Sequence, residues 1–259
     1  MKTVFALLAA VALTFLALPV LAIFLRVSPT TLLRELGDPV ARDALVLSLR
    51  TSAIAQSLVV VLGTPTAYLL ATRRFTGRSV LLTLVELPLV LPPAVAGIGL
   101  LAAFGRTGLF STSIAFTQAA VVLAVAFVAA PFYVRTAVAA FESVDPTLIG
   151  AARTLGAGPW RVFARIALPL SAGGLSAGFA LSFARGLGEF GATIMFAGSL
   201  QRVTQTLPLA IYAEFAHSFD VALAIGALLV LFSFALLLAV KWLRFGWISP
   251  FRFATSNSA

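Results

Sequence analysis

The sequence predicts an all-α integral membrane protein with six transmembrane helices, and three observations point to this class. Of its 259 residues, 61% are hydrophobic and only 10% are charged, whereas soluble domains carry roughly 25% charged residues. The mean hydropathy is +1.07. The apolar residues gather in runs of about 20, the length that a helix needs to cross about 30 Å of hydrocarbon. Lipid must therefore solvate much of the surface of this chain.

Six apolar runs bounded by charged residues are the candidate spans. They cover about Val4–Leu25, Thr51–Ala71, Val80–Phe104, Ile114–Val134, Ile166–Gly186 and Val221–Val240. The first run also has features of a signal peptide, because Lys2 precedes it and small residues close it. Its apolar length exceeds the roughly 7–15 residues of a signal-peptide core. We therefore expect a retained first helix and a multi-pass protein of the cell (inner or cytoplasmic) membrane.

The distribution of Lys and Arg predicts the orientation of the spans, because cytoplasmic loops carry an excess of basic residues. With the N-terminus in the cytoplasm, the inner segments hold eleven basic residues and the outer segments hold five. The inner set is Lys2, Arg73, Arg74, Arg78, Arg135, Arg153, Arg161, Arg165, Lys241, Arg244 and Arg252, and the outer set is Arg26, Arg34, Arg42, Arg106 and Arg202. We therefore expect both termini in the cytoplasm.

Composition also limits the chemistry of the chain. The formal net charge is +9, but the basic residues lie mostly between apolar runs, which favours contact with anionic lipid headgroups over nucleic acid. The absence of cysteine excludes disulfides and thiolate metal sites. The single histidine, His217, excludes a multi-histidine metal site within one chain. We expect no metal site, no catalytic residues, no cofactor bound by this chain and no nucleic-acid partner.

The third span contains a high density of proline. Residues 86–93 read Glu-Leu-Pro-Leu-Val-Leu-Pro-Pro, and each proline removes a backbone donor from a helix. Such a break persists in a membrane only where protein or a water-filled cavity satisfies the freed groups. We interpret this span as a kinked helix that lines a polar pathway, with Glu86, Pro92 and Pro93 as candidate pathway residues. The alternative is a packing kink with Glu86 at the cytoplasmic interface.

The fifth span is rich in small residues and ends in charged ones. Gly174 and Gly178 form a GxxxG pair that permits another helix to approach closely. Arg185 and Glu189 are four residues apart, so on a continuing helix they share a face and can neutralise each other. We interpret this region as a gate, and the alternative is an interfacial ion pair that anchors the helix end. The candidate gate residues are Arg185, Glu189, Phe190 and Thr193.

The segment between the fourth and fifth spans predicts a short helix, a tight turn and a second helix. Asp145 is a suitable N-cap with Pro146 at the first helical position, and Gly156 is a suitable helix stop. Gly158-Pro159 repeats the start signal and opens a helix into the fifth span. An apolar stripe runs along the short helix at positions i, i+1, i+4 and i+7. It consists of Leu148, Ile149, Ala152 and Leu155.

A helix of two to three turns with an apolar stripe is marginal alone and needs a surface to bury against. That surface is the rest of this chain, the lipid interface, or a groove on a partner protein that receives the helix.

The spacing within this segment resembles the EAA loop of importer permeases. In that loop an Ala-Ala pair is followed after three residues by Gly and after nine more by Ile-x-Leu-Pro. The corresponding residues here are Ala151-Ala152, Gly156 and residues 166–169. The sequence is therefore similar to the transmembrane subunits of type I ABC importers over about residues 44–240. Gly150 stands where the family has glutamate, so this position has no carboxylate to form a salt link with the ATPase.

Three further segments resemble the molybdate/tungstate branch of these permeases. They are residues 86–93 (ELPLVLPP), 188–198 (GEFGATIMFAG) and 205–212 (QTLPLAIY). Sulfate/thiosulfate permeases have related residues in these places and stay an alternative. The resemblance implies an ATPase-coupling loop that contains Asp145, Leu148, Ile149, Gly150, Ala151, Ala152, Leu155, Gly156 and Pro169.

The resemblance also implies the partners of the chain. These are a second copy of itself, two ATP-binding subunits that hold ATP and Mg²⁺, and an extracytoplasmic protein that delivers the oxyanion. The chain itself cannot contain a P-loop ATPase, because that loop requires a Gly-Lys-Ser/Thr context. Its only lysines, Lys2 and Lys241, stand in no such context.

We therefore divide the chain into three parts: a first transmembrane helix with an external segment (1–43), an ABC type-1 transmembrane domain (44–240) and a cytoplasmic tail (241–259). Two other classes of membrane protein predict features that this sequence lacks. A secondary transporter driven by an ion gradient predicts acidic residues at mid-membrane and internal symmetry, and neither is evident in the sequence. A membrane-embedded enzyme requires a catalytic cluster, and no recognisable motif of that kind occurs.

Overall fold

The computed structural model describes the backbone of residues 1–111 and 114–248, and the side chains of these residues except 36 and 240–248. Within that part of the chain all regular structure is helical. The elements are α1 (Lys2–Arg26), α2 (Pro29–Gly37), α3 (Pro39–Thr72), α4 (Arg78–Val90), α5 (Pro93–Phe104), α6 (Gln118–Glu142), α7 (Pro146–Thr154), α8 (Pro159–Val162), a π-helical turn (Phe163–Ala167), α9 (Leu168–Leu187), α10 (Gly191–Ala197), α11 (Leu207–Phe215) and α12 (Phe219–Ile248).

Among the described residues, five helical stretches are long and apolar enough to cross a membrane. They are α1, α3, α6, the continuous stretch from α8 to α9, and α12 up to Ala239. The bent pair α4 and α5 raises the number to six if it counts as one span. The predicted membrane class is therefore confirmed. Of the expected tail, residues 241–248 continue α12, and residues 249–259 lie outside the described residues.

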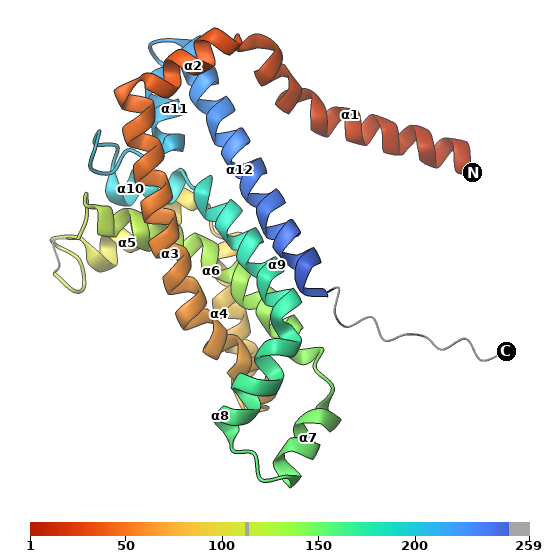
Figure 1. The fold of residues 1–259 in the computed structure, drawn as a ribbon. Coiled ribbons are helices and arrows are strands. Elements are labelled where there is room, and N and C mark those ends of the chain that lie inside the picture. The colour runs from red at the N-terminus through yellow and green to blue at the C-terminus, as the bar shows by residue number, and fades with distance from the viewer. Residues whose placement is uncertain (112–113, 249–259) are drawn as a thin grey trace.

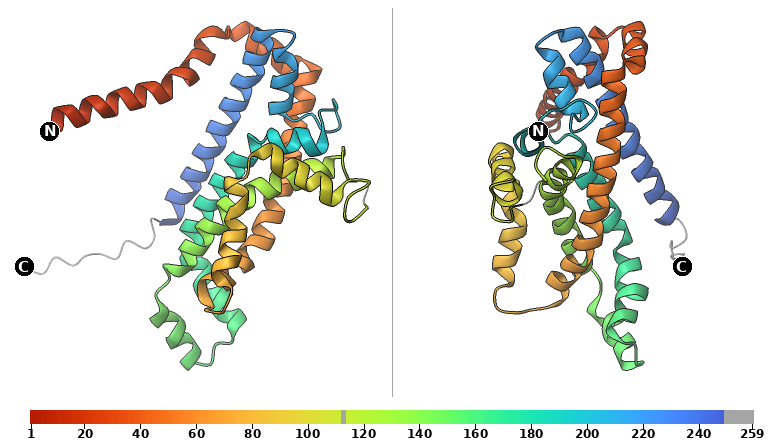
Figure 2. Two further views of the ribbon diagram at one scale, coloured as in Figure 1. Left: turned by 180° about the vertical axis from the view of Figure 1, so that it is seen from behind. Right: turned by 90° about the vertical axis from the view of Figure 1, so that its left-hand side faces the viewer.

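The predicted break in the third span is present, and it is sharper than a kink within one helix. The chain bends by 115° between α4 and α5. Pro88 is tolerated inside α4, whereas the Pro92-Pro93 pair ends it, because neither residue has an amide hydrogen to continue the ladder. Pro93 then occupies the first turn of α5, where a missing donor costs nothing. The two halves are separate helices that run in different directions (Figure 2).

Two other spans differ from the expected boundaries because of helix caps. α3 begins at Pro39, twelve residues before Thr51, since the Asp38 side chain accepts a hydrogen bond from the Val40 amide. Its 34 residues extend for about 51 Å at 1.5 Å per residue, well beyond the hydrocarbon layer. α6 begins at Gln118 rather than Ile114, because Thr117 caps it.

The centre of the bundle is α6, which packs between α3 and α9 (Figure 1). The predicted close approach at the glycine pair is confirmed. A Cβ on Gly174 would lie within 2.4 Å of the Ala140 side chain, and one on Gly178 would lie 3.1 Å from the Thr136 Cβ. Glycine therefore lets α9 lie against α6 at backbone distance.

The first helix stands apart from this bundle. α1 extends away from the other helices, none of its residues is buried, and it contacts α12 near the end that leads into α2 (Figure 1). At the opposite end of the bundle, α7 and the turn that joins it to α8 project away from the other helices. The molecule thus has two distinct ends, one formed by α2 and α11 and the other by α7 and α8.

Candidate functional site

The short helix α7 forms as its local signals predict. The Asp145 carboxylate accepts a 2.8 Å hydrogen bond from the Thr147 amide, and this bond lowers the pKa of Asp145 below its ordinary value, because it stabilises the charged carboxylate. The helix ends at Thr154, and Gly156 has φ +79°, in the left-handed region that glycine adopts without a steric penalty. A tight turn and a second helix follow.

The apolar stripe of α7, which ends at the C-cap residue Leu155, is only partly covered by the described residues. None of the residues of α7 is buried. Leu148 is 48% exposed and Leu155 is 87% exposed, whereas Ile149 and Ala152 are half-buried. Of the three surfaces that could cover the stripe, the rest of the chain covers only part of it.

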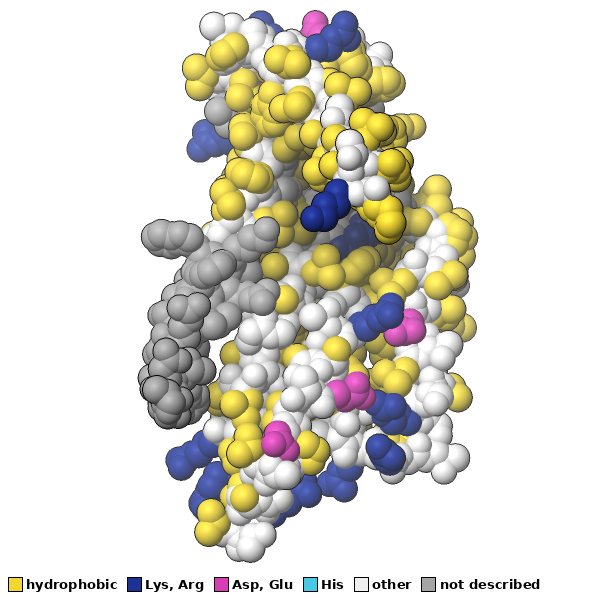
Figure 3. Space-filling view, turned by 90° about the vertical axis from the view of Figure 1, so that its right-hand side faces the viewer, with side chains coloured by type: hydrophobic (Ala, Val, Ile, Leu, Met, Phe, Trp, Pro, Cys, Tyr) yellow, Lys and Arg dark blue, Asp and Glu magenta, His cyan; other side chains and the backbone are white. Residues whose placement is uncertain are grey.

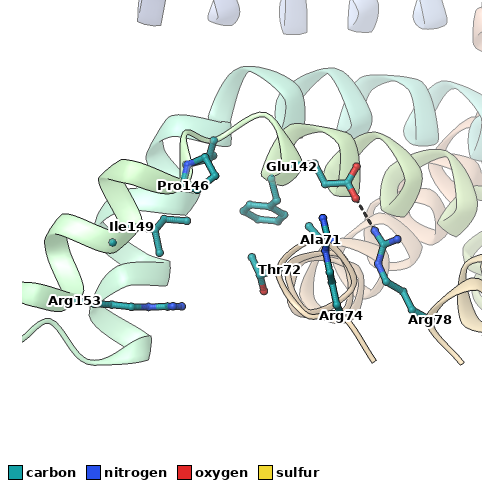
Figure 4. Close-up of a pocket in the computed structure, with 11 residues that line it drawn as sticks. Ala71, Thr72, Arg74, Arg78, Glu142, Pro146, Ile149 and Arg153 are labelled. Atoms are coloured by element: carbon teal, nitrogen blue, oxygen red, sulfur yellow. Dashed lines mark hydrogen bonds and ion pairs between the residues drawn. The ribbon is translucent and has the colours of Figure 1, made fainter. Parts of the chain in front are cut away.

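A cavity of about 770 Å³ lies between α7 and the turn that joins α3 to α4. Ile149 and Arg153 extend into it from α7, opposite Thr72 and Arg74 (Figure 4). Gly150 lines the same cavity, and a Cβ there would meet nothing within 4 Å. The family's glutamate position is therefore open space at the edge of this cavity.

The opposite wall of the cavity is held by an ion pair that the sequence analysis missed. Arg78 binds Glu142 at the end of α6 at 2.5 Å, and its Nε also donates to the Leu70 carbonyl at 2.6 Å. One arginine thus joins the ends of α3 and α6. Arg78 and Glu142 are 64 residues apart, so the sequence contains no local signal for this pair.

The broken third span lies directly against α10. A Cβ on Gly191 would lie 2.7 Å from the Pro93 Cβ, and one on Gly97 would lie 2.6 Å from the Ala192 carbonyl oxygen. Pro92 closes the first turn of α5 through its carbonyl, which accepts from the Ala96 amide at 3.1 Å. The structure therefore brings Pro92 and Pro93 of the third span beside the segment that follows the fifth span.

The predicted ion pair at the end of the fifth span is present. The Arg185 Nη1 atom lies 2.7 Å from the Glu189 Oε2 atom, although α9 already ends at Leu187. Glu189 also accepts a 2.8 Å hydrogen bond from the Ala192 amide, so it caps the first turn of α10. Its side chain is 1% exposed and that of Arg185 is 30% exposed.

The remaining candidates lie around this pair in different ways. Phe190 packs its ring 5.1 Å from that of Tyr212 on α11. Thr193 is fully buried, and its hydroxyl has no hydrogen-bond partner among the described residues. Glu86 lies 3.5 Å from Arg135 on α6 instead of joining the Arg185 pair. The gate roles of these residues stay predictions.

One further buried pair escaped the sequence analysis. Gln56 on α3 and Ser182 on α9 exchange hydrogen bonds of 2.7 and 3.0 Å. Buried amides and hydroxyls in spans act as polar contacts between helices. The sequence signal that could have predicted this pair was a glutamine, Gln56, within an apolar run.

The charged side chains are unevenly distributed between the two ends. Figure 3 shows Lys and Arg side chains gathered at the end where α7 and α8 lie, while apolar side chains cover much of the opposite half of this face. This distribution agrees with the basic segments that predict the cytoplasmic side.

Comparison with known proteins identifies the family. Residues 60–248 match the model of the binding-protein-dependent transport system inner membrane component. The chain belongs to this family. It is accordingly a multi-pass membrane subunit of a transport system and not an enzyme.

Relatives and a solved structure agree with this membership. The molybdenum transport system permease protein ModB of Mycobacterium tuberculosis is 45% identical over 87% of this chain and 88% of its own length. ModB of Escherichia coli strain K12 is 44% identical over 66% of this chain and 78% of its own length. A chain of a bacterial alginate ABC transporter has the same fold, with a TM-score of 0.76 at 16% identity over 94% of this chain and 95% of that chain.

Proposed function

We propose that this chain is the permease subunit of an ATP-driven importer of an oxyanion, molybdate or tungstate. The observation that carries the proposal is the 45% identity to a molybdenum permease over 87% of the chain. The unpartnered helix α7 supports it independently, because an importer without an ATPase site needs a surface on which a separate ATPase acts.

The proposed complex holds two copies of this chain, two ATP-binding subunits and one extracytoplasmic binding protein. ATP and Mg²⁺ are bound by the partner ATPases. In this arrangement the end formed by α7 and α8 faces the cytoplasm, as the basic residues there favour. Both termini are then cytoplasmic, and the binding protein docks at the end formed by α2 and α11.

The coupling step follows from the geometry of α7. The side chains of Leu148 and Leu155 are exposed in this chain, and a groove on the ATPase would bury them in the complex. Closure of the ATPases around ATP would carry α7 with it, and α7 is joined through Gly156 and α8 to the π-helical turn and α9. Movement of α9 would reach the Arg185–Glu189 pair at its far end.

Reconstitution tests the transport function directly. The chain is purified with its cognate ATPase and binding protein, placed in proteoliposomes, and assayed for molybdate uptake. Uptake should require ATP and both partners. Uptake driven by an ion gradient without the ATPase would contradict the proposal and support a secondary transporter.

Competition in the same assay tests the substrate. Unlabelled molybdate and tungstate should block uptake at concentrations at which sulfate has no effect. A preference for sulfate or thiosulfate would favour the sulfate branch while leaving the ATP-driven mechanism intact.

The docking role of α7 has a matched control. Leu155→Ser should release the ATPase from the detergent-solubilised complex during gel filtration. Leu109→Ser removes a side chain with nearly the same exposure, 86% against 87%, from a segment outside α7, and it should leave the complex intact. Retention of the ATPase by Leu155→Ser would remove α7 from the docking surface.

A further inference from the structure

A second cavity lies at the end of the bundle opposite α7. It has a volume of about 570 Å³ and is lined by residues of the α2–α3 junction, the outer part of α3, the start of α6 and the loop before α11. Its polar lining consists of Arg42, Asp43, Arg50, Gln118 and Arg202. Three guanidinium groups and one carboxylate therefore surround one space.

Two of these arginines have no carboxylate partner among the described residues. The Asp43 Oδ2 atom is already bound by the Arg202 Nε atom at 2.8 Å. Arg42 and Arg50 lie with Val46 on the i, i+4, i+8 ridge of α3, and all three residues line the cavity. The cavity thus keeps a net positive charge after its internal ion pair is counted.

The conformation of Arg202 adds a second, independent observation. Its φ of +66° lies in the left-handed region, a backbone conformation that residues other than Gly, Asn and Asp rarely adopt. The loop around it is held by the Leu200 carbonyl, which accepts from the amides of Val203, Thr204 and Gln205. Strained backbone of this kind persists where the surroundings enforce it, and it is concentrated at binding sites. Here it holds an arginine over the cavity.

The cavity lies on a part of α3 that water can reach. α3 extends for about 51 Å, roughly 20 Å more than the hydrocarbon layer. The cavity is lined by one side of its first twelve residues, from Pro39 to Arg50. A hydrated cavity with unpaired arginines attracts anions and holds them weakly. A site on a transport route must bind strongly enough to be occupied and weakly enough to release its ion.

We propose that this cavity is an anion-binding site that takes the tetrahedral oxyanion at the external face before it enters the translocation pathway. The guanidinium groups of Arg42 and Arg50 suit this chemistry, because their planar donor pairs match two oxygens of an oxyanion. The proposal rests on the proposed function for the orientation and for the identity of the ion. A phospholipid phosphate presents the same chemistry, so the test must separate these two sources.

The absence of cysteine from the chain provides a direct assay. Val46→Cys places a single thiol in the cavity lining, at a position that is 58% exposed. The complex of permease and ATPase is placed in nanodiscs of neutral phosphatidylcholine, without the binding protein, which binds molybdate itself and would cover this end. A negatively charged methanethiosulfonate reagent then modifies the thiol. Molybdate should slow modification at least threefold, relative to chloride at the same ionic strength.

Two sets of variants control this assay. Arg42→Gln with Arg50→Gln in the Val46→Cys background should abolish protection by molybdate, whereas Arg106→Gln, which removes an exposed arginine outside the cavity, should preserve it. Leu33→Cys, 69% exposed and outside the cavity lining, should be modified at the same rate with and without molybdate. Equal slowing by molybdate and chloride, or protection that survives loss of both arginines, overturns the proposal.

Changing the lipid composition of the nanodiscs shows whether the bound anion is molybdate or a phospholipid headgroup. If nanodiscs with phosphatidylglycerol protect the thiol in place of molybdate, and molybdate adds nothing in neutral lipid, the occupant is a headgroup and the proposal fails. Uptake by the wild-type complex is measured in parallel. ATP-dependent molybdate uptake without protection of the thiol overturns only this site, whereas loss of uptake in the wild type overturns the proposed function.

Discussion

Arg185 and Glu189 form a 2.7 Å ion pair across the end of α9, where the helix no longer continues. The Glu189 carboxylate also accepts from the Ala192 amide at 2.8 Å. The same side chain therefore joins the end of the fifth span to the start of α10. Its two bonds fix the direction in which the chain turns between the two helices.

Glu189→Gln should destabilise the protein and weaken coupling. The amide oxygen can still accept from Ala192, but the charge on Arg185 loses its counter-ion. We expect a loss of about 1.5–3 kcal/mol, the net value of a hydrogen bond to a charged group, together with ATP hydrolysis that is less dependent on the loaded binding protein. Thermal unfolding and ATPase assays on the complex measure both effects.

A double-mutant cycle separates the ion pair from the cap. Arg185→Gln with Glu189→Gln should be more stable than Glu189→Gln alone, because no unpaired charge remains. Equal stability of Glu189→Gln and the double variant would show that the unpaired Arg185 charge costs nothing. The Arg185→Gln single variant completes the cycle and gives the energy of the pair itself. Unchanged transport in Glu189→Gln would remove this residue from the gate.

Gly97→Ala should disturb the contact between α5 and α10. The added Cβ would lie 2.6 Å from the Ala192 carbonyl oxygen, which is backbone and cannot rotate away. We expect destabilisation of about 1–3 kcal/mol, as for other overpacked sites, and a loss of uptake. Gly99→Ala is the matched control on the same helix, because its Cβ would meet nothing within 4 Å. Equal unfolding temperatures for the two variants would contradict the close contact.

Gly156→Val should uncouple ATP hydrolysis from uptake while the protein still inserts. A β-branched residue at φ +79° is strained by about 1–3 kcal/mol, so the turn between α7 and α8 must change direction. The ratio of molybdate transported to ATP hydrolysed should fall several-fold in proteoliposomes. Gly158→Ala, at an ordinary φ of −68°, should keep the wild-type ratio. Wild-type coupling in Gly156→Val would contradict the role of this turn.

The charge on Asp145 should stabilise α7 in a pH-dependent manner. The pKa of Asp145 is lowered chiefly by the hydrogen bond from the Thr147 amide, and further by a hydrogen bond from the Thr147 side chain. A depressed folded-state pKa means that the stabilisation is fully present above about pH 4, the ordinary Asp value, and is lost as the pH falls through the lower folded value. Titration of the Asp145 carboxyl by NMR should give a midpoint below the ordinary value.

Variants at Asp145 distinguish the cap from the charge. Asp145→Ala should speed amide exchange in α7, since the substitution removes the N-cap acceptor for the Thr147 amide. Asp145→Asn keeps an acceptor oxygen and should retain most of the protection, without the pH dependence. Equal exchange in wild type and Asp145→Ala would show that the partner surface alone holds the helix.

Several features of the fold were predictable because their causes are local. The N-cap at Asp145, the left-handed stop at Gly156 and the restart at Pro159 follow from the preferences of neighbouring residues, and all three are present. The Arg185–Glu189 pair was predictable from its spacing, even though the helix ends between the two residues.

Other features depend on residues that are distant in sequence. The proline pair Pro92-Pro93 predicts a break in the helix. The 115° angle between α4 and α5, however, is maintained by the contact of α5 with α10, which lies about a hundred residues further along the sequence. The Arg78–Glu142 and Gln56–Ser182 pairs are likewise separated by 64 and 126 residues.

The sequence by itself determined that this is an integral membrane protein and that it lacks a P-loop. It also determined that a short capped helix with an apolar stripe separates the fourth and fifth spans. These properties follow from composition and from interactions within a few residues. Only the tertiary structure decided that the third span divides into two helices, that α7 is left exposed beside a cavity, and that Arg42 and Arg50 face one space with Arg202. The reason is physical: a broken span and a shared cavity are stabilised by contacts between segments that only packing brings together.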